Sequence, residues 1–279
     1  MIWRCRDRVF DLTARTLVMG VVNVTPDSFS DGGRFFAPGA AVAHARRLLA
    51  EGADLLDLGA ESTRPGAAPV SAAEQIRRLA PVLEVLAAGP AACLAVDTAS
   101  AEVAARALEL GARVVNDVTA LSDPGMAQVV ARSGAGLVLM HMAGTPATMQ
   151  QDPRYDDVAR EVRGHLAGRL EAARQAGIAA EQVALDPGIG FGKTVAHNFE
   201  LLARLGELTA LDRPVLVGVS RKSFLGRILD LPVDQRLEGG LAATAVAVFL
   251  GARVVRTHDV AATVRAVRVA DALRAARRP

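Results

Sequence analysis

The sequence contains few cysteines and few aromatic residues: of its 279 residues, 2 are cysteines and 4% are aromatic. Cys5 and Cys93 lie far apart along the chain and lack the spacing of a metal-binding pair. No two histidines stand at a zinc-like spacing either. We therefore expect no zinc site, and a reducing cytoplasm is the simplest setting for a chain with so few thiols.

The sequence also lacks an excess of charge and a long apolar run. Its 32 basic and 30 acidic residues give a net charge of +2, so binding to nucleic acid is not indicated. The longest nearly uncharged apolar stretch, residues 241–252, is shorter than the roughly 20 residues that cross a bilayer. The first residues are charged where a signal peptide would be apolar. We expect a globular protein that is neither exported nor embedded in a membrane.

What the sequence does contain is a repeated pattern, in which a short Val- and Leu-rich run is followed by polar residues and then by a stretch with helical period. Strands are predicted at residues 17–25, 55–61, 93–98, 114–119, 136–141, 183–186, 214–220 and 254–258. Eight β/α units indicate a closed parallel (β/α)8 TIM barrel. We expect a single domain over residues 1–279, with residues 1–15 forming an N-terminal hairpin that plugs the barrel floor. A doubly wound open sheet is the alternative, although it would leave edge strands.

Polar side chains stand at or near the end of each predicted strand. They are Asn23, Asp57, Asp97, Asn116, His141, Asp186, Ser220, Lys222, Arg256 and His258. In a barrel, the C-terminal mouth brings all strand ends around one axis, so we expect these groups to be neighbours in space. A carboxylate buried there needs a cation, a metal or the N–H groups of a ligand. By contrast, Ser71, Ser100 and Asp157 each precede a helical run and are interpreted as helix caps.

The glycine-rich segment "DPGIGFGKT", residues 186–194, resembles a phosphate-binding loop at first sight. The spacing does not fit a Walker A motif, because Gly188 and Gly192 enclose three residues where that motif has four. A complete G-x-G-x-x-G motif is not present either, since its last position falls on Lys193. We interpret the segment as a turn that places Phe191 over a ligand, with glycine allowing close backbone approach.

Several blocks, in this order, closely resemble dihydropteroate synthases. They are "MGVVNVTPDSFSDGG", "ESTRPGA", "VVNDV", "LMHMAGTPATMQ", "LDPGIGFGKT", "GVSRKSFLG" and "RTHDV". Ala60 and Ala143 are slight departures from the family pattern. The resemblance implies a (β/α)8 barrel of folate biosynthesis, a transferase that is a target of sulfonamides. It joins 6-hydroxymethyl-7,8-dihydropterin pyrophosphate to p-aminobenzoate with Mg²⁺ and releases pyrophosphate by a dissociative substitution at the exocyclic CH₂.

The resemblance also implies roles for individual residues. The pterin would contact Asp57, Asp97, Asn116, Met140, Asp186, Phe191, Gly218 and Lys222. Pyrophosphate would contact Asn23, Thr63, Arg256 and His258, with Asn23 also a ligand of Mg²⁺. The p-aminobenzoate site would contain Phe29, Thr63, Arg64, Pro65, Phe191, Lys222 and Ser223, and catalytic roles would fall to Asp31, Arg64, Lys222, Arg256 and His258. Residues 25–35 and 62–67 are predicted to be lids that exclude water from the reaction.

Three other functions remain as alternatives. A pteridine-binding methyltransferase domain would share the deep aspartate and asparagine pattern but would lack "SRKSFLG" and the first loop as written. A Schiff-base lyase or aldolase could use Lys222, because a lysine at a strand end can form an imine. A catalytically silent relative could bind pterins only. Members of the resembled family are usually homodimers, and the apolar segment 239–252 lies either at such an interface or under neighbouring elements.

Overall fold

The fold is a parallel barrel, as the sequence predicts. The computed structural model describes residues 1–25, 38–61, 69–89, 92–145 and 148–277. The barrel strands are β3 Leu17–Asn23, β4 Leu55–Gly59, β5 Cys93–Asp97, β6 Val114–Asp117, β7 Gly136–Met140, β8 Val183–Asp186, β9 Leu216–Gly218 and β10 Val254–Thr257. They pair in the order β8-β7-β6-β5-β4-β3-β10-β9, and a parallel bridge from Leu185 to Val215 joins the last strand to the first. The open doubly wound sheet is therefore wrong.

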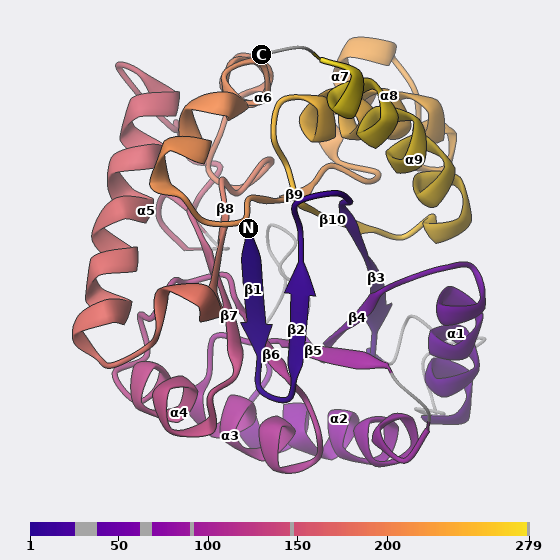
Figure 1. The fold of residues 1–279 in the computed structure, drawn as a ribbon, viewed down its shortest axis with the longest axis vertical. Helices are drawn as coiled ribbons and strands as arrows, with labels where there is room; N and C mark the ends of the chain where they lie inside the picture. The colour runs from indigo at the N-terminus through magenta and orange to yellow at the C-terminus, as the bar shows by residue number, and fades with distance from the viewer. Residues whose placement is uncertain (26–37, 62–68, 90–91, 146–147, 278–279) are drawn as a thin grey trace.

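Helices surround this barrel (Figure 1). They are α1 Pro38–Ala50, α2 Ala72–Ala87, α3 Ala101–Glu109, α4 Met126–Ser133, α5 Val158–Gln175, α6 Val195–Ala203, α7 Ser223–Leu229, α8 Leu237–Phe249 and α9 Val260–Ala276, with short 3₁₀ turns at Ala180–Gln182, Leu205–Leu211 and Val233–Gln235. Three predicted caps are confirmed. The side chains of Ser71, Ser100 and Asp157 accept hydrogen bonds from backbone N–H groups in the first turns of α2, α3 and α5.

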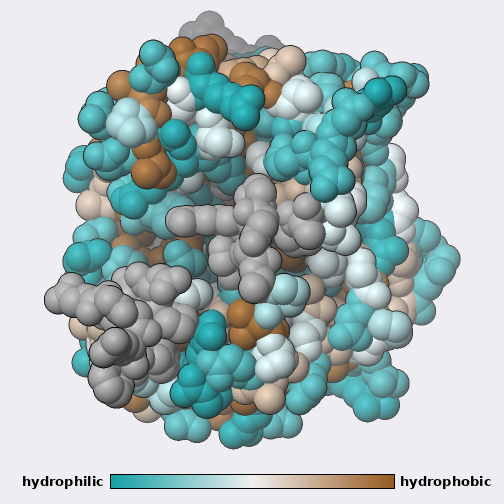
Figure 2. Space-filling view, turned by 180° about the vertical axis from the view of Figure 1, so that it is seen from behind, coloured by the Kyte–Doolittle hydropathy of each residue, from teal (hydrophilic) through white to brown (hydrophobic). Residues whose placement is uncertain are grey.

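The N-terminal end of the barrel is apolar and closed. The strands β1 Ile2–Cys5 and β2 Arg8–Asp11 form an antiparallel hairpin that lies across this end in Figure 1. Its Trp3 is fully buried, packs with inward-facing strand residues such as Leu55 and Val138, and donates a hydrogen bond from Nε1 to the Gln182 carbonyl at 2.9 Å. Polar groups of the barrel interior therefore concentrate at the opposite end. Figure 2 shows the molecule from that side, turned by 180° from Figure 1.

Most of the barrel strands are shorter than the sequence predicts, because the polar residues after each apolar run leave the sheet. Five such residues follow the last paired residue of their strand: Thr25, Glu61, Thr98, Thr119 and His141.

Among the described helices, none is long and apolar enough to cross a membrane.

Candidate active site

The deepest polar cluster at the C-terminal end of the barrel joins four strands through three hydrogen bonds. Asp57 Oδ2 accepts from Asn116 Nδ2 at 3.0 Å and from Arg256 Nε at 2.6 Å. The Nη2 group of Arg256 donates to Asp97 Oδ2 at 2.9 Å. These side chains come from β4, β5, β6 and β10, so residues up to 199 positions apart in sequence are in direct contact. The predicted meeting of strand ends is present for this group.

The electrostatics of this cluster follow from one guanidinium between two carboxyl groups. Asp57 is fully buried, and its Oδ1 has no hydrogen-bond partner in the described part of the chain. Burial, together with the negative charge of Asp57, raises the pKa of Asp97 to about 7, although Arg256 opposes the change. Burial alone would lower the pKa of Arg256, but the two carboxylates raise it. The cluster therefore contains a carboxyl group that can change its protonation state near neutral pH.

A second cluster lies on β8 and the segment after β9. Asp186 is buried, and its Oδ1 accepts from the Gly188 N–H at 2.7 Å. Lys222 Nζ donates to the Ile189 carbonyl and lies 4.7 Å from the centre of the Phe191 ring. Burial raises the pKa of Asp186 against the positive charge of Lys222, and burial lowers the pKa of Lys222 to about 8. The charge of Arg256 acts on both pKa values, so the two clusters form one electrostatic unit.

The glycine segment 186–194 makes close contacts that only glycine allows. Gly188, Gly190 and Gly192 have positive φ angles of 66°, 84° and 59°. A Cβ atom on Gly188 would lie 1.8 Å from the His141 carbonyl oxygen, and one on Gly190 would lie 2.9 Å from Lys222 Cδ. The close backbone approach predicted from the sequence is present, and it brings the loop against both β7 and Lys222.

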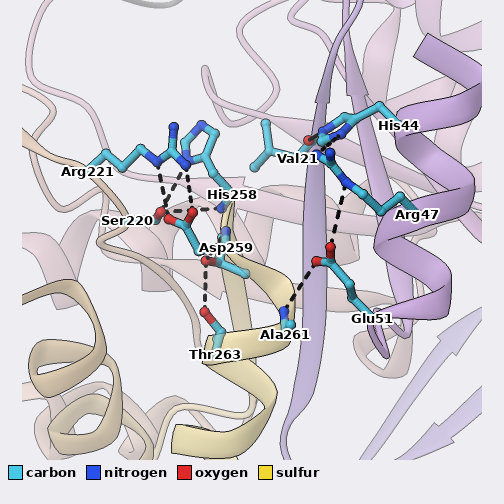
Figure 3. A network of polar contacts seen from close by, with 11 residues as sticks. Val21, His44, Arg47, Glu51, Ser220, Arg221, His258, Asp259, Ala261 and Thr263 are labelled. Atoms are coloured by element: carbon cyan, nitrogen blue, oxygen red, sulfur yellow. Dashed lines mark hydrogen bonds and ion pairs between the residues drawn. The ribbon is translucent and has the colours of Figure 1, made fainter. Parts of the chain in front are cut away.

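His258 lies at the rim, in a network that ties the start of α9 to its neighbours (Figure 3). Ser220 Oγ lies 3.3 Å from the His258 backbone nitrogen and 3.1 Å from its Nδ1. Arg221 forms an ion pair with Asp259 at 2.6 Å, and this pair lowers the pKa of Asp259. On the other side in Figure 3, Glu51, directly after α1, accepts from the Ala261 N–H at 3.4 Å. The backbone that carries His258 is thus held from two directions.

Comparison with known proteins identifies the family. The family model described as "Pterin binding enzyme" matches residues 19–258. Dihydropteroate synthase of Escherichia coli K12 is 47% identical over 255 residues, covering 91% of this chain and 90% of that protein. A Yersinia pestis dihydropteroate synthase structure with a sulfonamide drug complex has a TM-score of 0.93 at 44% identity, covering 99% of this chain and 100% of that one. A Xanthomonas albilineans structure in complex with 7,8-dihydropteroate has a TM-score of 0.89 at 45% identity and covers 99% of both chains.

The chain belongs to the dihydropteroate synthase family.

The sites expected in a dihydropteroate synthase separate here by depth. Asp57, Asn116, Met140 and Asp186 are buried, whereas Asn23, Asp97, Phe191, Lys222, Arg256 and His258 are half-buried. Met140 ends β7 in register with Asp186, and Gly218 ends β9 in register with Arg256. Ser223 is exposed at the first position of α7. The buried residues are thus all ones assigned to the pterin, whereas the half-buried residues include both pterin residues and the described pyrophosphate residues.

Five of the residues expected in a dihydropteroate synthase site lie outside the described residues. Asp31 and Phe29 fall within 26–37, and Thr63, Arg64 and Pro65 fall within 62–68. Most of the two predicted lids fall in the same ranges. Their roles stay predictions.

Few of the described residues of the synthase site could bind Mg²⁺ directly. Over the described ranges, no group of three or more His, Cys, Asp or Glu side chains could hold a metal ion. Asn23 is half-buried at the end of β3 and offers an amide oxygen, a ligand type that Mg²⁺ accepts. Because Mg²⁺ usually keeps waters and binds substrate phosphates, such a site fits an ion that arrives with pyrophosphate.

One buried group beside the synthase site was missed by the motif analysis. Lys193 was named from the sequence only as the residue that makes a G-x-G-x-x-G motif incomplete. In the structure, its Nζ lies 3.0 Å from Nδ1 of His141, which follows β7. A signal was available, because Lys193 and Lys222 are the only lysines among the 32 basic residues. Lys193 lies on the glycine segment after β8 and Lys222 on the segment after β9, and these two segments form the second cluster.

Proposed function

We propose that this protein condenses 6-hydroxymethyl-7,8-dihydropterin pyrophosphate with p-aminobenzoate to give 7,8-dihydropteroate and pyrophosphate. The observation that carries the proposal is the bonded cluster of Asp57, Asp97, Asn116 and Arg256 beside Asp186 and Lys222. It lies in a barrel that closely matches a synthase structure in complex with 7,8-dihydropteroate. We place the reaction in the cytoplasm, which stays a prediction from the sequence.

The pterin is recognised by the deep polar groups. A pterin presents N–H donors and a carbonyl acceptor along one edge, and carboxylates with an amide and an ammonium complement that edge. Asp186 and Asn116 are buried, and their hydrogen bonds with Gly188 and Asp57 do not use all of their polar groups, so an analogue that lacks the matching group would leave the remaining ones unpaired. Such a pocket can reject an analogue by a factor of roughly 10⁴ or more. Met140 and Phe191 supply apolar contact to the ring.

The chemistry is a substitution at the exocyclic CH₂ in which the C–O bond to pyrophosphate breaks ahead of attack by the amine. Arg256 and His258 stabilise the negative charge that grows on the leaving group. Arg256 uses Nε and Nη2 for Asp57 and Asp97, and we assign its third nitrogen, Nη1, to a phosphate oxygen. Mg²⁺, held by Asn23 and the phosphates, would add further positive charge there when bound. No general base is required for the attack, because an arylamine is already a neutral nucleophile, and the acidic ammonium group that forms with the new N–C bond releases its proton to water.

Binding is ordered, with the pterin pyrophosphate first. The predicted lids are polar and glycine-rich, and they would complete the p-aminobenzoate site only when pyrophosphate is present. Isothermal calorimetry of p-aminobenzoate with and without pyrophosphate and Mg²⁺ tests this order. We expect weak binding without pyrophosphate, and equal affinity in the two conditions would contradict the order.

The protein is a homodimer through the face formed by α7, α8 and α9. Of the 12 large hydrophobic side chains that are exposed among the described residues, 8 lie on these helices or on the short turn Val233–Gln235 between α7 and α8. They are Ile228, Leu229, Val233, Leu237, Val246, Phe249, Val269 and Leu273. Brown side chains gather at the upper left of Figure 2, on the side where these helices lie when Figure 1 is seen from behind. An apolar face of this kind is typical of an interface.

One observation favours a second function. The pKa of Lys222 is lowered to about 8, and a lysine with a lowered pKa can act as an imine-forming nucleophile. Two assays separate the functions. The synthase releases pyrophosphate only when both substrates are present, and borohydride traps no adduct. Covalent trapping of a carbonyl substrate on Lys222, with no pyrophosphate release, would favour the lyase instead.

A further inference from the structure

The glycine loop after β8 is held by side chains along its whole length. Each carbonyl from Gly188 to Gly192 accepts a hydrogen bond from a side chain. The donors are Lys193 Nζ to Gly188 O and Phe191 O, both at 3.0 Å, Lys222 Nζ to Ile189 O, Gln150 Nε2 to Gly190 O at 3.0 Å, and Tyr155 Oη to Gly192 O at 2.8 Å. Carbonyls that belong to no sheet or helix ladder need such partners. The shape of this loop therefore depends on the side chains around it.

Lys193 is the centre of this arrangement. Its side chain is 3% exposed, and its Nζ has a third neighbour, His141 Nδ1, at 3.0 Å. An ammonium group has three N–H donors, and the two carbonyls and the imidazole provide three acceptors. Burial, followed by the positive charge of Lys193, lowers the pKa of His141 to about 3. His141 is therefore neutral, and its Nδ1 can accept the hydrogen bond when the ring proton is on Nε2.

Burying the charged ammonium group of Lys193 lowers the stability of the folded protein. Burial lowers the pKa of Lys193 to about 7, against the attraction of Asp186. An apolar side chain of similar length would fill the space without that cost. It could not, however, form hydrogen bonds with two carbonyls three residues apart and with the His141 ring just after β7 at once. The other basic residues of the chain are all arginines, so lysine is used only beside this loop.

We propose that Lys193 is a positioning residue for the pterin: it clamps the glycine loop to β7 and thereby sets the places of Asp186, Phe191 and Lys222. The inference rests on the proposed synthase function and extends it to a residue that does not touch the substrate. Three contacts transmit the effect. Gly188 donates to the Asp186 carboxylate, the Lys222 side chain runs beside Gly190, and the Phe191 ring lies below the Lys222 ammonium.

The test compares two substitutions of buried polar residues at opposite ends of the barrel. Lys193→Met keeps the length of the side chain and removes its hydrogen bonds. Gln182→Met, the matched control, removes a buried side chain that donates to the Ala135 carbonyl at 2.7 Å below the barrel floor. Both variants should lower the melting temperature. Calorimetry with pterin pyrophosphate, well below both melting temperatures, should show at least roughly tenfold weaker binding for Lys193→Met and an unchanged Kd for Gln182→Met.

The second readout uses the scarcity of lysine. Protein labelled with ¹³C at lysine Cε has two lysine side-chain signals, and Lys193→Met has one. In the variant we expect the pKa of Lys222, about 8 in the unmodified protein, to rise toward its ordinary value, because burial is the main cause of its lowered pKa and the loop that buries Lys222 loosens. A purely structural role of Lys193 would lower the melting temperature and leave this titration unchanged.

A milder variant covers the case in which Lys193→Met does not fold. Tyr155→Phe removes only the hydroxyl that donates to Gly192, so we expect about fivefold weaker pterin binding. The proposal is overturned if Lys193→Met, or Tyr155→Phe where the first variant does not fold, binds the pterin as the unmodified protein does. A protein that makes no dihydropteroate would refute the proposed function, whereas the Lys222 titration would still report on the clamp.

Discussion

At the scale of single residues, Asp57 shows how one buried group organises several others. It is fully buried, lies in the middle of β4, and bonds both Asn116 and Arg256 through the same oxygen. An unpaired carboxylate at this depth would be costly, so the guanidinium of Arg256 offsets most of that cost. Because Arg256 also bonds Asp97, the charge of Asp57 reaches a second carboxyl group. Asp57 therefore acts on the site through its neighbours.

Replacing Asp57 should change the titration of Asp97. Asp57→Asn removes a negative charge, so we expect the pKa of Asp97 to fall from about 7 toward its ordinary value. Carboxyl ¹³C NMR measures this pKa directly. The stability follows the same sign: because the pKa of Asp97 is raised in the folded protein, its contribution is present below the unfolded pKa of about 3.9 and is lost as the pH rises through about 7.

Urea unfolding between pH 4 and pH 7 checks this dependence. The unmodified protein should show a contribution from Asp97 that declines toward pH 7, and Asp97→Asn, the matched control, should lack it. In Asp57→Asn the decline should occur at lower pH. A titration of Asp97 that does not respond to Asp57→Asn would show that burial alone sets its pKa.

Single residues were also where the sequence was least informative. Asp57, Asp97, Asn116 and Asp186 could be predicted because each stands at or near the end of an apolar run, and the motifs also contain Asn116 and Asp186. Lys193 could not be assigned a role, because its partner His141 is 52 positions away and the contact depends on the path of the glycine loop. Hydrogen bonds between distant loops leave no periodic signal in a sequence.

At the scale of elements, the glycine loop is the part of the site with the least tolerance for change. Gly188 has a φ of 66°, and a Cβ there would lie 1.8 Å from the His141 carbonyl oxygen. Gly188→Ala should therefore lower the melting temperature and weaken pterin binding by more than tenfold, since the loop must move away from β7. Thermal unfolding and calorimetry measure the two effects.

Gly168→Ala is the matched control for this substitution. Gly168 lies in α5, and a Cβ there meets no atom within 4 Å. Alanine favours a helix by about 1 kcal/mol relative to glycine, so this variant should gain stability and keep its affinity for the pterin. Equal behaviour of the two variants would mean that the close approach at Gly188 is relieved without cost.

The strands show what local patterns can and cannot predict. All eight were predicted from short Val- and Leu-rich runs, and β8 was predicted with its observed bounds. The segment 214–220 was too long, because pairing in β9 covers only Leu216–Gly218. The chain turns soon afterwards at Arg221, whose φ is 60°. Propensity marks the apolar centre of a strand, whereas tertiary pairing decides where it ends.

At the scale of the whole molecule, closure of the barrel separates stability from function. The apolar end is sealed by the hairpin with Trp3, and the polar end gathers the site. The count of β/α units predicted this closure, since eight parallel strands with crossover helices fill a ring. The sequence did not decide whether the apolar segment 239–252, most of which lies in α8, is covered by neighbouring elements or forms an interface, because a helix that is apolar on all sides is compatible with both.

The oligomeric state of two variants tests whether the face formed by α7, α8 and α9 is the dimer interface. Val246 of α8 is 52% exposed, and Val246→Glu should convert a dimer into monomers because a carboxylate would be buried in the interface. Val85→Glu on α2, where the valine is 45% exposed, is the matched control and should remain dimeric. Analytical ultracentrifugation distinguishes the two. A dimer that persists in Val246→Glu would place the interface elsewhere.

The most direct test of the central claim is a crystal structure of the protein with bound 6-hydroxymethyl-7,8-dihydropterin pyrophosphate. The account predicts that the pterin ring lies at the C-terminal mouth of the barrel, within hydrogen-bond distance of Asp97, Asn116 and Asp186, with its pyrophosphate at Arg256 and His258. A pterin bound anywhere else on the molecule, or bound at the mouth without contact to these side chains, would contradict the account.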